Sequence, residues 1–206
     1  MNRAGAKTNR DVERFDRWAG RYDNSFLQRL VFAPIHRELI RALGMLEGRA
    51  VLDVGCGTGI LTLALATRAA RAVGVDPAPR MVARAAEKPA GPNVWFAVAL
   101  AESLPFSDSS FDAATASMTV HHWHDASRGF GELARILRPG AVLAIADIAV
   151  AGPLRRVLRL VQSPHAGFGL TEVTLMLTDA GFERVRTSTR RFIPFGPRRA
   201  IVVAVR

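Results

Sequence analysis

One short stretch, Val51–Gly59, limits the folds open to this chain more than any other feature of the sequence. It begins with a brief apolar run that contains Asp53, and three glycines then alternate at every second position (Gly55, Gly57 and Gly59). Glycine adopts left-handed backbone conformations without strain, so a tight loop is expected here, leading into a helix that begins at Ile60. A strand, a glycine loop and a helix N-terminus in this order are typical of α/β proteins that hold a small polar ligand at the carboxyl end of a sheet.

The rest of the chain alternates between strand-like and helix-like segments. We expect strands at 51–54, 72–75, 93–99, 111–117 and 141–148, and helices at 60–70, 79–88 and 125–137. Strands that alternate with helices of this length form a parallel sheet with helices on both faces. After a helix at 171–180, two strand-like runs at 182–192 and 200–205 follow each other closely, and such neighbours pair antiparallel. The predicted fold is therefore α/β: a doubly wound, seven-stranded, mostly parallel sheet with a C-terminal antiparallel hairpin.

The length of 206 residues suits one α/β domain and is too short for two. Apolar residues at helical spacing in 24–46, divided by Pro34, predict two N-terminal helices. We expect 1–46 to be a helical segment that covers the ligand site, and 47–206 to be the ligand-binding domain, with a lid region near 152–170.

Several bulk properties bear on location and partners. The longest apolar stretch, 141–151, is about half of the roughly 20 residues that span a bilayer, and residues 1–14 lack the apolar core of a signal peptide. A single cysteine excludes an internal disulfide, which fits a reducing cytoplasm. The net charge of +10 would favour anionic partners, but its arginines are spread along the chain, which also fits a compositional habit.

The spacing of the glycines and a second acidic residue narrow the ligand. A dinucleotide loop has the pattern G-x-G-x-x-G, whereas this loop is G-x-G-x-G and continues with Ile60. Asp76 ends the second predicted strand, where its carboxylate can accept hydrogen bonds from both hydroxyls of a ribose. Asp76 could instead cap the helix after Pro77, and Asp53 could either accept from an ammonium group or orient the loop.

Beyond these patterns, the chain resembles class I S-adenosylmethionine-dependent methyltransferases, of the ubiquinone/menaquinone-methyltransferase-like group. Four stretches carry the resemblance: Val51–Gly59; Gly74-Val75-Asp76 with Met81; Ala101–Phe106 followed by Phe111-Asp112; and Arg135–Gly140. The resemblance implies a Rossmann-like methyltransferase fold, S-adenosylmethionine as cofactor and S-adenosylhomocysteine as its product. It also implies these cofactor-binding residues: Tyr22, Asp53, Gly55, Cys56, Gly57, Gly59, Asp76, Pro77, Met81, Ala101, Glu102 and Ser117.

The implied contacts divide among the parts of the cofactor. The glycine loop would approach the methionine and ribose, Met81 would lie against the adenine, and Ser117 would face the methionine. Ala101 and Glu102 would line the adenine pocket. Family members commonly carry Asp just before this pair, whereas this chain has Leu100, a loss of one polar contact worth about 1 kcal/mol.

The segment Phe15–Asp23 resembles the amphipathic N-terminal segment that folds over the cofactor in this family, with Tyr22 closing the methionine end. A surface helix with its aromatic side packed on the core explains the same pattern equally well. We leave both interpretations open.

Two histidines just after the fourth predicted strand, His121 and His122, are candidate general bases, since a neutral imidazole can remove a proton from an acceptor. The alternative is that they only pack and shape the loop. Together with His124 and Asp125 they also resemble metal ligands, but neighbouring side chains of an extended segment point to opposite sides, so we expect no metal site.

The acceptor is less constrained than the donor. Methyltransferases of exocyclic base amines carry an Asn/Asp-Pro-Pro-aromatic motif where this chain reads Ser117-Met118-Thr119-Val120, so a nucleic-acid substrate is disfavoured. We expect a small, apolar or aromatic molecule with an O, C or N acceptor. The alternatives are a non-catalytic cofactor-binding sensor or partner protein, and a lipid or quinone methyltransferase at a membrane surface. The last would use a helix at 154–161 with one apolar and one arginine-rich face, a pattern that also fits a lid helix.

Overall fold

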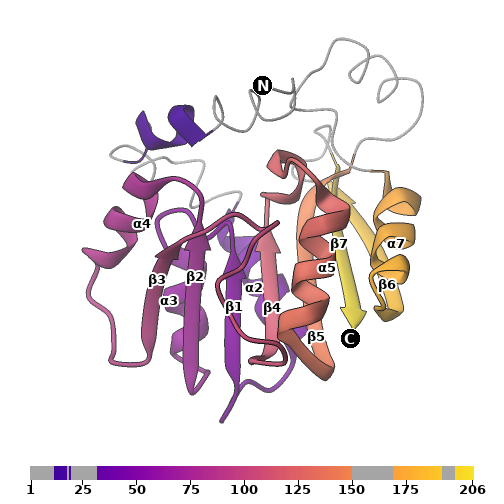
Figure 1. Cartoon of the computed structure of the whole chain (residues 1–206), viewed down its shortest axis with the longest axis horizontal. Helices are drawn as coiled ribbons and strands as arrows, with labels where there is room; N and C mark the ends of the chain where they lie inside the picture. Colours follow the sequence, from indigo (N-terminus) through magenta and orange to yellow (C-terminus); the bar gives the residue numbers. More distant parts are fainter. Residues whose placement is uncertain (1–11, 18, 20–31, 150–168, 192–197) are drawn as a thin grey trace.

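The structure is a computed structural model that describes residues 12–17, 19, 32–149, 169–191 and 198–206 (Figure 1). Its described part contains one seven-stranded sheet in the order β3-β2-β1-β4-β5-β7-β6. The strands are β1 (Ala50–Val54), β2 (Arg71–Asp76), β3 (Val94–Val98), β4 (Phe111–Ser117), β5 (Leu137–Ala149), β6 (Glu183–Arg191) and β7 (Arg198–Val205). Around it lie α2 (Ala33–Leu43), α3 (Ile60–Ala66), α4 (Pro79–Ala86), α5 (Ala126–Ile136), α7 (Leu170–Asp179) and the short 3₁₀ helix η2 (Val120–His122).

The predicted fold class is confirmed. Strands β1 to β5 pair in parallel, and β7 runs antiparallel to both of its neighbours, β5 and β6. The sequence pattern did not predict the order of the strands. In the structure, β7 lies between β5 and β6. The reason is burial: β7 is apolar and largely buried, whereas β6 carries charged and exposed residues that are suited to the edge of a sheet.

Helices cover both faces of the sheet, with α5 in front and α2 and α3 behind in Figure 1. Successive residues of a strand point to opposite faces, so Leu52 packs in the cluster that contains α5 and α7, and Val51 packs in the cluster that contains α2 and α3. By the same alternation, Asp53 points to the side of α2 and α3. That placement determines its neighbours in the site described below.

The ends of several elements differ from the sequence expectation. Helix α3 ends at Ala66 rather than near residue 70, because the Asn93 side chain donates to the carbonyls of Ala66 and Ala69 at distances of 2.9 and 3.1 Å. Strand β5 begins four residues earlier than expected, at Leu137, which pairs with Phe111 of β4. Within the described ranges, none of the helices combines the length and the apolar composition required to cross a bilayer.

Candidate functional site

The glycine loop between β1 and α3 is the centre of the site. Gly55, Gly57 and Gly59 have φ values of 71°, 53° and 79°, in the left-handed region that favours glycine. A Cβ at Gly55 would overlap the Thr119 hydroxyl, and one at Gly59 would lie 2.7 Å from the Phe96 ring. The loop is also tied to the next strand, because the backbone N–H groups of Gly55 and Cys56 both donate to the Val75 carbonyl.

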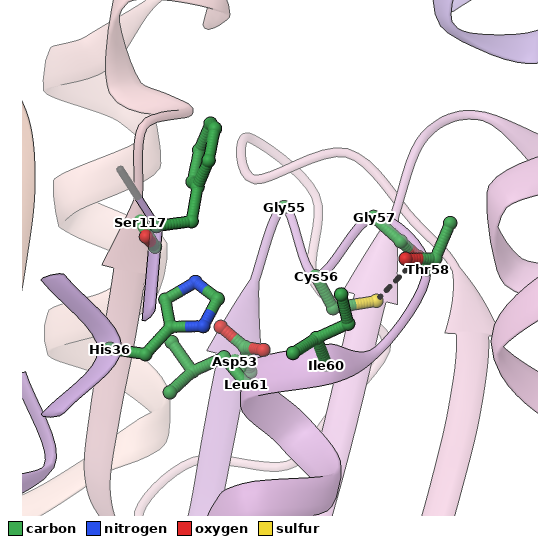
Figure 2. A pocket seen from close by; sticks show the side chains of 10 residues that line it. His36, Asp53, Gly55, Cys56, Gly57, Thr58, Ile60, Leu61 and Ser117 are labelled. Atoms are coloured by element: carbon green, nitrogen blue, oxygen red, sulfur yellow. Dashed lines mark hydrogen bonds between the residues drawn. The ribbon is translucent and has the colours of Figure 1, made fainter. Parts of the chain in front are cut away.

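This loop separates two cavities. The smaller, with about 360 Å³ of empty space including its open mouth, is lined by Phe32, His36, Asp53, Gly55, Cys56, Gly57, Thr58, Ile60, Leu61 and Ser117 (Figure 2). The larger, with about 600 Å³, is lined by Val12, Phe15, Gly55, Gly57, Asp76, Pro77, Ala78, Met81, Ser117, Met118, Thr119 and His122. Gly55, Gly57 and Ser117 border both, so one extended ligand can contact both cavities across the loop.

Asp53 lies on the wall of the smaller cavity and is almost fully buried, with 1% of its surface exposed. Its two carboxylate oxygens accept from the hydroxyls of Thr62 at 2.7 Å and Thr115 at 2.9 Å. Burial raises the pKa of the Asp53 carboxyl from 3.8 to about 6. Asp53 therefore connects β1 to α3 and β4, and it remains an acceptor at the wall of a cavity.

Three further polar groups border the smaller cavity. His36 projects into it from α2 (Figure 2), and burial lowers the pKa of this imidazole to about 4, so the ring is neutral near pH 7. The Ser117 hydroxyl oxygen is buried and has no hydrogen-bond partner among the described residues. The Cys56 thiol is buried and contacts the Gly57 carbonyl at 3.6 Å; burial raises its pKa, so it stays protonated. This cavity offers acceptors and a hydroxyl, which suits a small ligand group that carries hydrogen-bond donors.

Asp76 lies on the other side of the loop, at the wall of the larger cavity. Its Oδ2 accepts from the Gly57 N–H and its Oδ1 from the Ala78 N–H, both at 2.9 Å. Burial raises the pKa of this carboxyl too. Each oxygen has a second lone pair, so Asp76 can hold the loop and still accept from a pair of ligand hydroxyls. Pro77 and Met81 provide apolar surface beside it.

Two of the described N-terminal residues border the larger cavity. Val12 and Phe15 line it, and Ala19 packs in a small apolar cluster with Ala78 and Met81. Asp16 accepts from the Arg80 N–H at 2.9 Å, which satisfies an amide in the first turn of α4. The predicted cofactor residue Tyr22 lies outside the described residues, as do the helix expected at 154–161 and nearly all of the lid region near 152–170.

The two predicted bases lie at the carboxyl end of β4, in η2. His122 lines the larger cavity, and its ring centroid is 3.9 Å from that of His121 and 5.1 Å from that of Phe15. His121 Nδ1 lies 2.6 Å from Asp147 Oδ1 on β5. No cluster of three or more potential metal-ligating side chains occurs among the residues that the structure describes.

Three predicted cofactor residues line neither cavity. Ala101 packs in the core, Gly59 precedes α3 in the left-handed conformation, and Glu102 accepts from the backbone N–H groups of His124 at 2.6 Å and Asp125 at 3.0 Å. Glu102 therefore anchors the loop that follows the two histidines. Leu100, the departure from the family pattern, is 43% exposed.

Sequence reasoning missed His36 and Asp147 as site residues. Asp147 had a local signal, since it is a lone acidic residue inside an apolar strand. His36 had none, because a histidine within an amphipathic helix does not reveal which cavity the helix borders.

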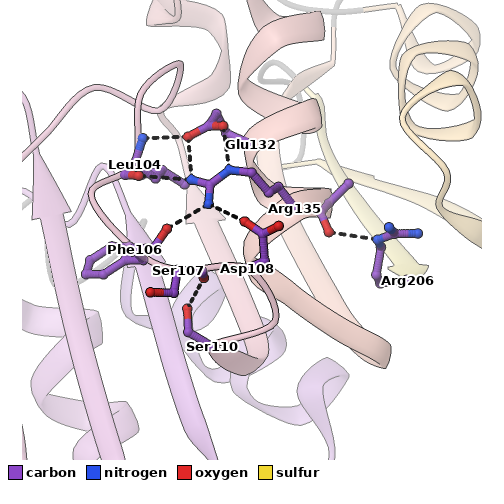
Figure 3. Close-up of polar contacts among 9 residues, drawn as sticks. Leu104, Phe106, Ser107, Asp108, Ser110, Glu132, Arg135 and Arg206 are labelled. Carbon is purple, nitrogen blue, oxygen red and sulfur yellow. Dashed lines mark hydrogen bonds and ion pairs between the residues drawn. The ribbon is translucent and has the colours of Figure 1, made fainter.

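The last two motifs of the family resemblance contact each other (Figure 3), and none of their residues lines either cavity. The Arg135 guanidinium donates to the carbonyls of Leu104 and Phe106 and pairs with Glu132 and Asp108. This network lies where the chain enters β4 and β5, at the amino ends of the strands, whereas the cavities lie at the carboxyl ends. These motifs hold the end of α5 against the loop that precedes β4, and they do not line the site.

Comparison with known proteins identifies relatives of this chain. A family model described as a methyltransferase domain matches residues 52–145. The ubiquinone/menaquinone biosynthesis C-methyltransferase UbiE of Geobacter sulfurreducens is 32% identical, covering 79% of this chain and 66% of its own length. The O-methyltransferase rstn1 of Aspergillus nomiae is 37% identical, covering 71% of this chain and 70% of its own length.

Three other relatives are matched over only 56–59% of their own lengths, so the chain spans little more than half of them. Among solved structures, a Haloferax volcanii chain in complex with the Trm112 methyltransferase activator has a TM-score of 0.78 at 21% identity. That match covers 93% of this chain and 96% of the other, and it shows a shared fold.

Proposed function

Because this chain belongs to the class I S-adenosylmethionine-dependent methyltransferases, we propose that it transfers a methyl group from S-adenosylmethionine to a small, apolar or aromatic molecule. The observation that carries the proposal is the larger cavity. There a carboxylate with free lone pairs, Asp76, lies beside a glycine loop and an apolar wall that includes Met81. A ribose and an adenine need this combination of acceptor and apolar surface.

The residues present fit this cofactor on two observations. Gly55 has no room for a side chain beside Thr119, and the buried Ser117 hydroxyl has no partner within the described part of the chain. In the proposed arrangement Asp76 binds the ribose hydroxyls, Pro77 and Met81 contact the adenine, and Gly55, Gly57 and Ser117 lead to the methionine end. Asp53 and Cys56 would border that end in the smaller cavity. Tyr22, Gly59, Ala101 and Glu102 remain predictions.

The bound cofactor supplies an electrophilic methyl group on a sulfonium, so the protein mainly has to bind, orient and exclude water. Val12 and Phe15 line the larger cavity, and Asp16 accepts from the Arg80 N–H at the start of α4. On this basis we propose that residues 1–46 cover the site and that 47–206 are the binding domain, with a lid near 152–170. His121 and His122 are the candidate bases for an acceptor that arrives protonated.

Two relatives differ in the atom that their names state is methylated, carbon for UbiE and oxygen for rstn1, so family membership leaves the acceptor atom open. A non-catalytic binding protein is not favoured, since these relatives are named as methyltransferases. We further propose a cytoplasmic location, no nucleic-acid partner, and a weak membrane-surface association through 154–161. Flotation with liposomes tests the last, with Arg155, Arg156 and Arg159 replaced by Glu as the control.

Two experiments test the main proposal in sequence. Calorimetry with S-adenosylmethionine and S-adenosylhomocysteine should show binding of both, and absence of binding at millimolar concentration would rule out the assigned site. Incubation with methyl-labelled cofactor and a cell extract should then move label into a small molecule. Label that stays entirely in the cofactor would contradict methyl transfer while leaving cofactor binding intact.

A further inference from the structure

An imidazole and a carboxylate are paired where β4 and β5 end, next to the larger cavity. His121 Nδ1 lies 2.6 Å from Asp147 Oδ1, and the two side chains are only 8% and 7% exposed. The carboxylate is also held by backbone donors: its Oδ2 accepts from the His121 N–H at 3.1 Å, and its Oδ1 from the Ile148 N–H at 2.6 Å. Since the backbone fixes the carboxylate, the carboxylate in turn sets the orientation of the ring.

This pairing determines which ring nitrogen is basic. An ionised carboxylate only accepts hydrogen bonds, so Nδ1 of the neutral ring must carry the hydrogen and Nε2 must carry the lone pair. A carboxylate behind Nδ1 also stabilises the imidazolium that forms when Nε2 takes a proton. The arrangement therefore prepares His121 to accept a proton at Nε2.

Neither His121 nor Asp147 lines either cavity itself, but the pair lies beside the larger one. The neighbouring residues Ser117, Met118, Thr119 and His122 all line the larger cavity, and the His122 ring lies 3.9 Å from the His121 ring. Two titratable groups contact the His121 ring among the described side chains, Asp147 from β5 and His122 from η2. Arg199 on β7 pairs with Ile148, one residue along, so it points to the opposite face, where it binds Glu38.

We infer that Asp147 is a positioning residue for His121 as general base, and that the acceptor reacts through a protonated hydroxyl group. This inference rests on the proposed function. An amine with a free lone pair needs no base in the methylation step, whereas a neutral hydroxyl is a poor nucleophile until its proton leaves. A built imidazole–carboxylate pair beside the methyl-donor site therefore points to an acceptor that loses a proton, and we assign that acceptor as an oxygen, such as a phenol, with methylation of a carbon acid as an outcome that the test separates.

The chemical balance of the step is simple. The methyl carbon–sulfur bond breaks, and its electron pair remains on sulfur. A carbon–oxygen bond forms to the acceptor, whose hydroxyl proton passes to His121 Nε2. The imidazolium pairs with Asp147 and then releases the proton to water, so the products are a methyl ether, S-adenosylhomocysteine and one proton.

The test uses the full-length protein, labelled S-adenosylmethionine, and a panel of substituted phenols and naphthols, each matched with the corresponding amine and thiol. The hydroxyl pKa values should range from about 10, the value of an ordinary phenol, down to about 6. The wild-type protein should label oxygen. Asp147→Asn and His121→Gln should slow transfer to the weakly acidic phenols by about 10²–10⁴-fold. Acceptors already ionised at the assay pH should lose less than about tenfold, because they need no base.

His124→Gln is the matched control, because His124 is exposed on the same loop and its side chain lies outside the proposed pair. It should behave as wild type throughout the panel. Nitrogen-15 NMR of the imidazoles gives a readout that is independent of turnover: His121 should show the Nδ1–H tautomer in the wild type and lose that preference in Asp147→Asn.

Label only on carbon, nitrogen or sulfur, no label on any acceptor, or an equal loss for acidic and weakly acidic phenols would each overturn the inference. The last result would indicate a merely structural role for the pair. Calorimetry with S-adenosylhomocysteine on the wild type and the same variants distinguishes failure of the hydroxyl inference from failure of the proposed function. Retained binding with label on another atom, or with an equal loss across the phenols, contradicts the hydroxyl inference alone. Absent binding in the wild type, or label that also stays in the cofactor with the cell extract, contradicts the proposed function itself.

Discussion

Asp53 and Asp76 both lie near the carboxyl ends of neighbouring strands, β1 and β2, yet their surroundings differ. Asp53 accepts from two threonine hydroxyls that belong to α3 and β4, so it joins three elements of the core. Asp76 accepts from two backbone amides of the adjacent loops and lines the larger cavity. Because its donors are side chains from distant elements, Asp53 mainly stabilises the fold. Because its donors are backbone amides of the loops, Asp76 mainly fixes the shape of the ligand site.

The largest expected effect comes from the loop that separates the two carboxylates. Gly55→Ala should destabilise the protein by about 2–5 kcal/mol, because its φ of 71° strains a side chain and its Cβ would overlap Thr119. Chemical denaturation measures this loss. Gly131→Ala is the control: it lies in α5 with no atom within 4 Å of a new Cβ, and it should be stabilising by about 0.5–1 kcal/mol. Equal unfolding midpoints for Gly55→Ala and wild type would show that the loop is not rigid.

The next effect tests Asp53 as a fold-holding carboxylate. Its pKa of about 6 in the folded state is above the unfolded value of 3.8, so the folded state binds the proton more tightly. This contribution to stability is complete below about pH 4 and is lost as the pH rises through about 6, a change of about 2–3 kcal/mol. The unfolding free energies of wild type and Asp53→Asn should be measured from pH 3.5 to 7.5, and the variant should lack this fall. If the gap between wild type and variant stays constant over that range, Asp53 does not have this role.

The third prediction concerns Asp76 as the ligand-binding carboxylate. Asp76→Ala should weaken binding of S-adenosylhomocysteine by about 1.5–3 kcal/mol, the scale of lost hydrogen bonds to a charged group. Calorimetry measures the affinity, and denaturation shows whether the fold remains intact. Asp179→Ala, at an exposed position near the end of α7, should bind like wild type. Unchanged affinity in Asp76→Ala would contradict the ribose assignment.

The smallest effect should come from the cover of the larger cavity. Phe15→Ala removes an aromatic side chain that lines this cavity and contacts His122, so S-adenosylhomocysteine binding should weaken by about 1 kcal/mol. Glu13→Ala, exposed on the same helical turn, should have no effect. If both variants bind like wild type, residues 12–17 do not cover the bound ligand, and the surface-helix interpretation of the segment is preferred.

Much of the fold was predictable because its signals are local. Alternating apolar patterns and the turn residues between them indicated all seven strands and their predominantly parallel pairing, and the terminal hairpin followed from two adjacent strand-like runs. The insertion of β7 between β5 and β6 was not predictable in this way. It depends on which of two strands buries more apolar surface in the finished sheet, and that requires the rest of the core.

In the candidate site, too, some features follow from local sequence and others only from tertiary contacts. The sequence by itself determined the backbone of the glycine loop, because positive φ values select glycine at Gly55, Gly57 and Gly59 whatever surrounds them. It also placed Asp76 at a strand end. Only the tertiary structure decided that Asp53 would be bonded by Thr115, 62 residues away, and that Asp147 would pair with His121, 26 residues away. Those contacts depend on strand adjacency and register, which are set by the burial of the whole core and by no local pattern.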